Sequence, residues 1–137
     1  FYHFGMRLLV GALVPNRFDY NSPWFQTKKF EERLYKMLRL REWKSQLPTY
    51  NPRLFCLQEQ TLEQIAVNMC QAEVVHEIII VLSFLPLLFS LMWGSFPVFL
   101  ITSAVAAFID LLFAMLQRFN RPRIMKTIRI QARRNAR

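Results

Sequence analysis

No lysine or arginine occurs between Arg53 and Arg118. The flanks of this gap hold all 18 basic residues and four acids, a net charge of +14, whereas the gap holds five acids and therefore −5. Within it, the 39 residues from Ile78 to Leu116 contain one ionisable side chain, that of Asp110. Since about 20 apolar residues cross a bilayer as a helix, this segment is long enough to cross twice. The alternative is a buried helical pair, but a soluble domain of this size rarely buries so long a segment with one charge.

The apolar segment is interrupted once, at Gly94 and Ser95. Glycine suits the residue that follows a helix, and serine suits the N-cap of the next one. The sequence therefore predicts an all-α integral membrane protein built on a transmembrane helical hairpin, about 78–93 and about 96–117. Pro86 lies inside the first arm and should kink it.

The basic flanks predict an orientation. Both ends of a hairpin return to one membrane face, and the positive-inside rule places that face, with the C-terminus, in the cytoplasm. The flanking charge also suits anionic lipid headgroups. Nucleic-acid binding through the Arg-rich tail is disfavoured, because the tail has one aromatic residue and no fold of its own. With 53% hydrophobic residues the chain is not disordered, and two cysteines form neither a disulfide scaffold nor a zinc spacing.

Two further helices flank the hairpin on its N-terminal side. A helix over about 23–44 has apolar and basic residues at roughly helical spacing. It fits an interfacial helix in the headgroup plane or a soluble amphipathic helix, and the adjacent hairpin favours the interfacial one. Phe1 to Val14 is apolar except for His3 and Arg7, and it is too short to span a bilayer. We expect the end of a truncated N-terminal spanning helix, with a processed signal remnant as the alternative.

A carboxylate and an imidazole stand at the entrance to the first arm. Glu73 and His76 are three residues apart and share a helix face. The carboxylate could hold the imidazole in one tautomer and strengthen it as a base, or the pair could be a satisfied polar cluster at a helix end. A di-iron bundle needs two Glu-x-x-His motifs, and the chain has one, so no metal site is predicted.

Asp110 lies inside the second arm, where an acid is costly and is by default a functional candidate. It could reach the cytoplasmic end of the arm. It could instead hydrogen-bond a polar group such as Ser83 across the hairpin and join the two helices.

Basic residues with a neighbouring aromatic residue occur on both sides of the hairpin. Those of 117–123 could bind phosphates bidentately, or they could anchor the membrane exit. The same two interpretations apply to Arg41, Trp43 and Lys44, because tryptophan with cations is also a common interface anchor.

Three blocks of this sequence follow a recognisable order and spacing. They are Arg41-Glu42-Trp43-Lys44 (R-x-W-K), Ala72-Glu73-Val74-Val75-His76 (A-E-x-x-H) and Gln117-Arg118-Phe119-Asn120-Arg121-Pro122-Arg123 (Q-R-[YF]-N-R-P-R). Together with the apolar hairpin between the last two, they resemble the glycosyl-4,4′-diaponeurosporenoate acyltransferase family of small bacterial membrane proteins. The resemblance spans about 14–130, and members of that family usually carry an upstream hydrophobic helix.

The resemblance implies a function and roles for these residues. The reaction would transfer a fatty acyl group to a sugar hydroxyl of a membrane glycolipid, similar to a glycosylated carotenoid acid, at the cytoplasmic face of the bacterial cell membrane. His76 would be the general base, oriented by Glu73. The substrate-binding candidates are Arg41, Trp43, Lys44, Asp110, Arg118, Asn120, Arg121 and Arg123.

The expected partners follow from the same reading. They are membrane lipids, a lipid-linked acceptor and an acyl donor, either a thioester or a phospholipid, with no cofactor and no nucleic acid. A partner protein or a homo-oligomer stays open, and one membrane domain over 1–137 is expected. The alternative function is a non-catalytic membrane subunit that binds lipid or a partner enzyme.

Overall fold

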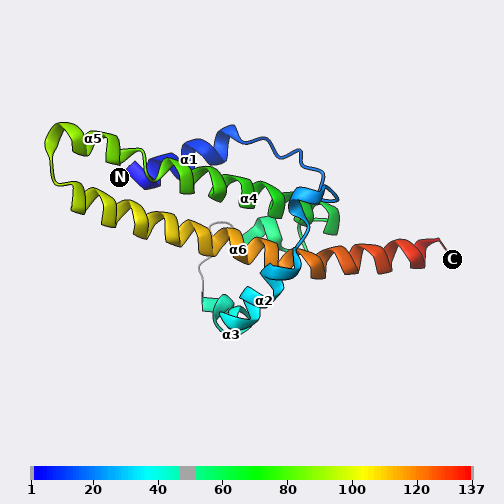
Figure 1. Ribbon diagram of the computed structural model, residues 1–137. Helices are drawn as coiled ribbons and strands as arrows, with labels where there is room; N and C mark the ends of the chain where they lie inside the picture. Colours follow the sequence, from blue (N-terminus) through cyan, green and yellow to red (C-terminus); the bar gives the residue numbers. More distant parts are fainter. Residues whose placement is uncertain (1, 47–51, 137) are drawn as a thin grey trace. The chain divides into compact units, whose positions relative to one another are not determined.

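The computed structural model describes residues 2–46 and 52–136 (Figure 1). Every regular element in these residues is helical, as the sequence predicts. In chain order the elements are α1 (Tyr2–Leu13), η1 (Pro23–Phe25), α2 (Lys29–Met37), α3 (Leu40–Trp43), η2 (Lys44–Gln46), η3 (Pro52–Phe55), α4 (Leu62–Leu82), α5 (Pro86–Trp93) and α6 (Phe96–Asn135).

The chain divides into two compact units. The first consists of the chain up to Pro15 together with Gln71–Met115, and the second of Asn16–Cys70 together with the chain from Leu116 onward. The helices α4 and α6 therefore contribute residues to both units. The expectation of a single membrane domain stays a prediction.

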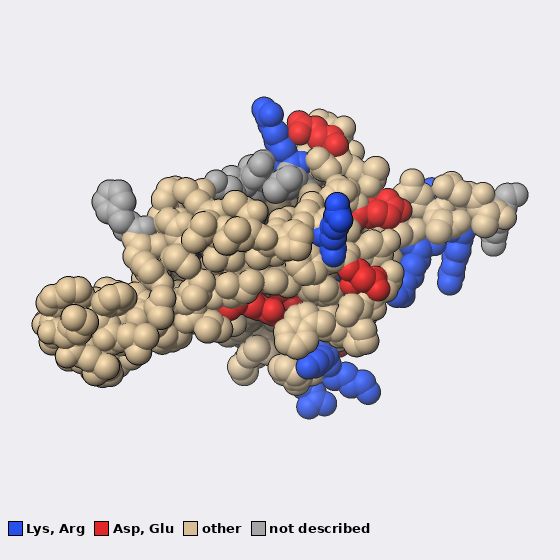
Figure 2. All heavy atoms as spheres, turned by 90° about the horizontal axis from the view of Figure 1, so that it is seen from above, with Lys and Arg blue, Asp and Glu red and all other residues tan. Residues whose placement is uncertain are grey.

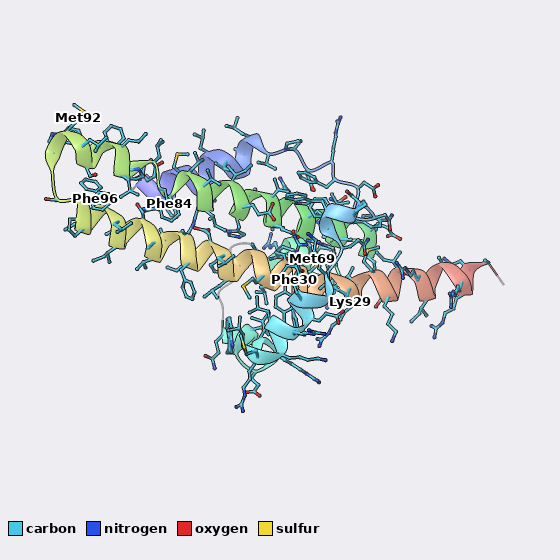
Figure 3. The ribbon with its side chains drawn as sticks, in the orientation of Figure 1. Lys29, Phe30, Met69, Phe84, Met92 and Phe96 are labelled. Atoms are coloured by element: carbon cyan, nitrogen blue, oxygen red, sulfur yellow. The ribbon has the colours of Figure 1, made fainter. Side chains whose placement is uncertain are left out.

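Two helical stretches, Leu62–Trp93 and Phe96–Asn135, are long and apolar enough to cross a membrane. Only 17% and 33% of their most apolar windows are buried in the protein, whereas a core helix of a soluble protein would bury most of such a window. Figure 2 shows no Lys, Arg, Asp or Glu on the visible face of α5 and the start of α6. Met92 points away from α6 at this end (Figure 3) and is 76% exposed. Exposed apolar surface of this extent suits contact with lipid.

Local sequence explains where these helices begin and end. α4 ends at Leu82, and α5 begins at Pro86, which occupies the first turn, a position where proline is tolerated. The sequence predicts a kink at Pro86, and the structure has a break between two helices there. Gly94 follows α5 with a φ of 71°, a left-handed conformation that glycine adopts at low cost. α6 begins at Phe96, as predicted, and continues through Pro122 to Asn135, well beyond the predicted spanning arm of about 96–117.

The single helix predicted over 23–44 is wrong. The second unit divides this segment into η1, α2 and α3. The break after α2 falls at Arg39, whose φ of 50° is left-handed and leaves the helical region. Trp43 donates from Nε1 to the carbonyl of Leu38 at 2.8 Å, so this predicted substrate contact is engaged locally across the break. The interfacial position of the segment stays a prediction.

α1 is tied to α4 at both of its ends within the first unit. The Tyr2 hydroxyl donates to the carbonyl of Leu82 at 3.0 Å, and Gln71 Nε2 donates to the carbonyl of Val14 at 2.8 Å. The start of α1 thus pairs with the end of α4, so the two helices run antiparallel (Figure 1). The identity of α1 as the end of a spanning helix stays a prediction.

Candidate active site

Asp110 is the centre of a polar cluster in the first unit. Its side chain is fully buried on α6. Its Oδ2 accepts a hydrogen bond from Arg7 Nη2 at 2.8 Å, and its Oδ1 lies 2.8 Å from His76 Nδ1. An acid at such a position needs a partner to offset its desolvation. Here α1 and α4, which are distant from Asp110 in sequence, supply these partners, Arg7 and His76.

The contacts of His76 leave one ring nitrogen for chemistry. An ionised carboxylate only accepts hydrogen bonds, so with Asp110 ionised His76 Nδ1 is the donor of this pair. In the neutral imidazole Nε2 then carries the lone pair. The imidazole also stacks on Phe113, with ring centres 5.2 Å apart and an interplanar angle of 17°. Phe113 lies three residues after Asp110 on α6, so one helix face supplies both contacts. The His76 side chain keeps 20% of its surface exposed, which allows a ligand to approach.

One sequence-based interpretation of this region is wrong, and another is untested. Ser83 was a candidate partner for Asp110, but its hydroxyl donates to the carbonyl of Ile79 in its own helix at 2.8 Å, so that pairing is wrong. Asp110 supplies a carboxylate contact to His76. Glu73 is fully buried one turn before His76, and its predicted catalytic role stays a prediction.

Arg7 is the residue of this cluster that sequence reasoning did not select. The available signal was a lone cation in an apolar N-terminal segment and a lone acid in a distant apolar segment. Charges in such surroundings usually pair with one another. Among the described residues, no group of three or more His, Cys, Asp or Glu side chains could hold a metal ion.

The 117–123 segment of α6 presents two faces in the second unit. Gln117, Asn120 and Arg123 follow one another at three-residue intervals and line a cavity of about 390 Å³. The remaining lining is apolar and comes from Phe55, Ile65, Met69, Leu116 and Ile124. Apolar walls with a few polar groups on one side suit an amphiphilic ligand. Gln117 was part of a recognised sequence block but was not selected as a site residue.

Arg118 lies on the other face and bonds to the protein itself. Its Nε donates to Glu31 Oε2 and its Nη2 lies 3.1 Å from Glu31 Oε1. Nη2 also donates to the carbonyls of Trp24 and Gln26 at 3.2 Å. Such a bidentate pair fixes geometry as well as charge. Arg118 therefore joins α6 to η1 and α2, and its role in substrate binding stays a prediction.

Arg121 has a similar structural setting. Its side chain is 2% exposed, and Nη1 donates to the carbonyl of Phe25 at 2.7 Å. The guanidinium also lies 5.0 Å from the centre of the Phe25 ring, a cation–π contact. Both contacts hold η1 against α6, and substrate binding by Arg121 likewise stays a prediction.

Arg41, Asn120 and Arg123 lie near Lys44, and we call these four residues the Lys44 cluster. Lys44 Nζ donates to Asn120 Oδ1 at 2.9 Å, and both Lys44 and Arg123 lie over the Phe119 ring. Burial lowers the pKa of Lys44, and the charges of Arg123 and Arg41 lower it further. A bound anion would offset this repulsion, so the cluster suits a phosphate or another anionic group.

Loss of the charge on Arg118 and loss of the charge on Arg123 should have different effects, because the two residues lie on different faces of α6. Arg118→Gln and Arg123→Gln remove the same charge from one helix. The first leaves the buried Glu31 without its guanidinium and should lower the free energy of unfolding by about 1–3 kcal/mol. The second should change it by less than about 0.5 kcal/mol and instead weaken binding of an anionic ligand. Denaturation and ligand titration of both variants check this, and equal destabilisation by both would contradict it.

The model of the glycosyl-4,4′-diaponeurosporenoate acyltransferase family matches residues 21–130, which is 110 of the 137 residues. The chain belongs to this family. No curated protein and no solved structure matches it.

Family membership makes the protein an acyltransferase. Its substrates are therefore an acyl donor and a lipid-linked acceptor, and the family name refers to a glycosylated carotenoid acid. The match includes every site residue predicted from the sequence. Arg7 lies outside it.

Proposed function

We propose that this acyltransferase moves a fatty acyl group onto a sugar hydroxyl of a membrane glycolipid of the glycosyl-carotenoid kind. His76 is the general base of the reaction. One observation carries this proposal: His76 Nδ1 lies 2.8 Å from the buried Asp110 carboxylate, which leaves Nε2 free to accept a proton. A carboxylate on the far nitrogen selects this tautomer and stabilises the imidazolium that forms.

The proton moves twice in the proposed reaction. His76 Nε2 takes the proton of the acceptor hydroxyl while the hydroxyl oxygen attacks the acyl carbonyl carbon. The resulting tetrahedral intermediate collapses, the bond between the acyl carbon and the donor breaks, and the imidazolium returns the proton to the leaving thiolate or alkoxide. An ester of the sugar and a protonated leaving group are the products. Glu73 supports the imidazole from one turn earlier on the same helix.

The Lys44 cluster binds the anionic part of the donor in this proposal. Lys44 and Arg123 supply positive charge and Asn120 supplies an amide. The apolar walls of the cavity suit an acyl chain. Arg118, Arg121 and Trp43 act by holding the surrounding helices.

The membrane arrangement is proposed on the charge distribution and the apolar helices. The two apolar stretches form a transmembrane hairpin whose charge-free turn lies at Gly94, with α2 and α3 at the interface. The Lys- and Arg-rich flanks, including the C-terminus, face the cytoplasm of a bacterial cell. The enzyme is then multi-pass and meets soluble donors and membrane acceptors on one side.

The function is tested with the purified protein in lipid nanodiscs. The acceptors are a glycosyl-carotenoid acid and the same carotenoid acid without sugar, and the donors are an acyl thioester and a phospholipid. We expect an acyl ester only on the glycosylated acceptor, detected by mass spectrometry. Acylation of the sugar-free acceptor would refute the sugar-hydroxyl assignment. No product from either donor, with a folded protein, would favour the non-catalytic subunit.

The lowered pKa of Lys44 predicts how donor binding depends on pH. Because this pKa lies below the value of about 10.4 of an ordinary lysine, Lys44 loses its charge at a lower pH than other lysines do. The KM for an anionic donor should therefore rise at alkaline pH. Lys44→Arg, which stays charged, should keep a low KM to a higher pH, and the same pH dependence in both proteins would contradict the prediction.

The same shift has a consequence for stability. Between the folded and the unfolded pKa of Lys44, the folded state binds fewer protons than the unfolded state. The contribution of Lys44 to the free energy of unfolding therefore increases with pH in that interval. Donor binding and stability should move in opposite directions there, which separates loss of binding from unfolding.

A further inference from the structure

Arg7 stands midway along a helix that is held in place at both ends. The bonds from Tyr2 to Leu82 and from Gln71 to Val14 fix α1 antiparallel to α4. Arg7 lies between these bonds on α1, and His76 lies between them on α4. The antiparallel pairing therefore brings the two residues to the same level of the first unit, where Asp110 contacts both.

The geometry of the guanidinium is that of an orienting group. Arg7 Nη2 donates to Asp110 Oδ2 at 2.8 Å. The other carboxylate oxygen is the one on His76 Nδ1. A carboxylate held at one oxygen by a charged donor has lost most of its rotational freedom. The orientation of its second oxygen, which faces His76, is therefore fixed as well. Arg7 Nε is itself buried and has no hydrogen-bond partner among the described residues, which is a cost that a simple surface anchor would avoid.

We infer that Arg7 is a positioning residue of the acyltransferase, acting through Asp110 on His76. Its guanidinium holds one oxygen of the Asp110 carboxylate, the other oxygen holds the proton of His76 on Nδ1, and Nε2 stays free for the acceptor hydroxyl. This inference rests on the proposed role of His76. It goes beyond the family match, because Arg7 precedes the matched residues 21–130. The functional part of this chain then includes α1.

The test follows the tautomer of His76 directly. The chain has two histidines, so His3→Gln leaves His76 as the only imidazole for ¹⁵N NMR of the histidine-labelled protein in nanodiscs. In this background we expect one tautomer, protonated on Nδ1. Arg7→Met should replace it with a mixture that includes Nε2-protonated imidazole, and Arg7→Lys should restore the original spectrum in large part. Arg17→Met, which removes an exposed arginine of the second unit, is the matched control and should leave the spectrum unchanged.

Kinetics of the same proteins provide the second readout. Arg7→Met should lower kcat by about 10- to 100-fold, by analogy with the loss of partners that orient metal-ligating histidines. KM for the donor should change little, and Arg7→Lys should recover most of kcat. If Arg7→Met does not insert, Arg7→Gln replaces it in both measurements. An unchanged tautomer and an unchanged kcat in the inserted variant would overturn the inference and make Arg7 purely structural.

Failure of the proposed function would look different. A wild-type protein without acyl transfer, or a fully active His76→Ala variant, would refute His76 as the base. The NMR comparison would still show whether Arg7 sets the tautomer of His76.

Discussion

His76→Ala should lower kcat for acyl transfer by about 10²–10⁴-fold, the contribution of a positioned general base. In the proposed mechanism, Asp110 lies 2.8 Å from His76 Nδ1 and directs the proton there, so that Nε2 is the proton acceptor. Alanine removes that acceptor, so the acceptor hydroxyl must attack without losing its proton to the protein. The measurement is the initial rate of product formation by mass spectrometry, with donor and acceptor above their KM values.

The control for this variant is the other histidine. His3→Ala removes an α1 imidazole that contacts the Tyr2 ring and lies within electrostatic range of Arg7 and Asp110. Because Arg7 and His76 supply the bonds to Asp110, it should keep most of the wild-type rate. Both proteins must show the same membrane insertion and the same helical circular dichroism. A His76→Ala protein that turns over at the wild-type rate would refute the base assignment and favour a structural role for His76.

Asp110→Leu should lower the free energy of unfolding more than Arg118→Gln or Arg123→Gln does. It leaves Arg7 and His76 without the buried carboxylate that joins them. Breaking a buried ion pair by removing one partner costs about 3–5 kcal/mol. We expect the lower end of this range, because the Arg7 side chain is 36% exposed and can turn toward solvent or lipid headgroups. Denaturation in bicelles measures the change, and activity should fall as in His76→Ala.

A double variant separates stability from catalysis. Arg7→Met with Asp110→Leu removes both charges, and replacing a whole buried ion pair by apolar side chains is often neutral or stabilising. We expect it to recover most of the stability that Asp110→Leu loses and none of the activity. Recovery of activity would contradict a role for Asp110 in orienting His76. Additive destabilisation by the two substitutions would contradict their pairing.

Helix ends and apolar stretches were predictable because their causes are local. Pro86 begins α5 and Gly94 follows its end, each through its own backbone properties. The break at Arg39 was not predictable in this way, because a left-handed arginine has no local signature in the sequence. The helix predicted over 23–44 therefore divides where the residue pattern continues without a break.

The roles of the arginines after the hairpin depended on which helix face each occupies. Sequence reasoning treated Arg118, Arg121 and Arg123 as one group. In the structure, Arg118 pairs with Glu31 and Arg121 donates to the Phe25 carbonyl, whereas Arg123 lines the cavity. A helical projection could have separated the two faces, but which face meets protein depends on residues far away in the sequence.

The sequence by itself determined that this chain is helical, that two stretches can cross a membrane, and that it resembles a family of acyltransferases. Those conclusions depend on composition, periodicity and short motifs, which are properties of neighbouring residues. Only the tertiary structure decided that Asp110 joins His76 to Arg7. The physical reason is that a buried charge takes its partners from whatever helices pack against it, and these partners lie 34 and 103 residues away along the chain.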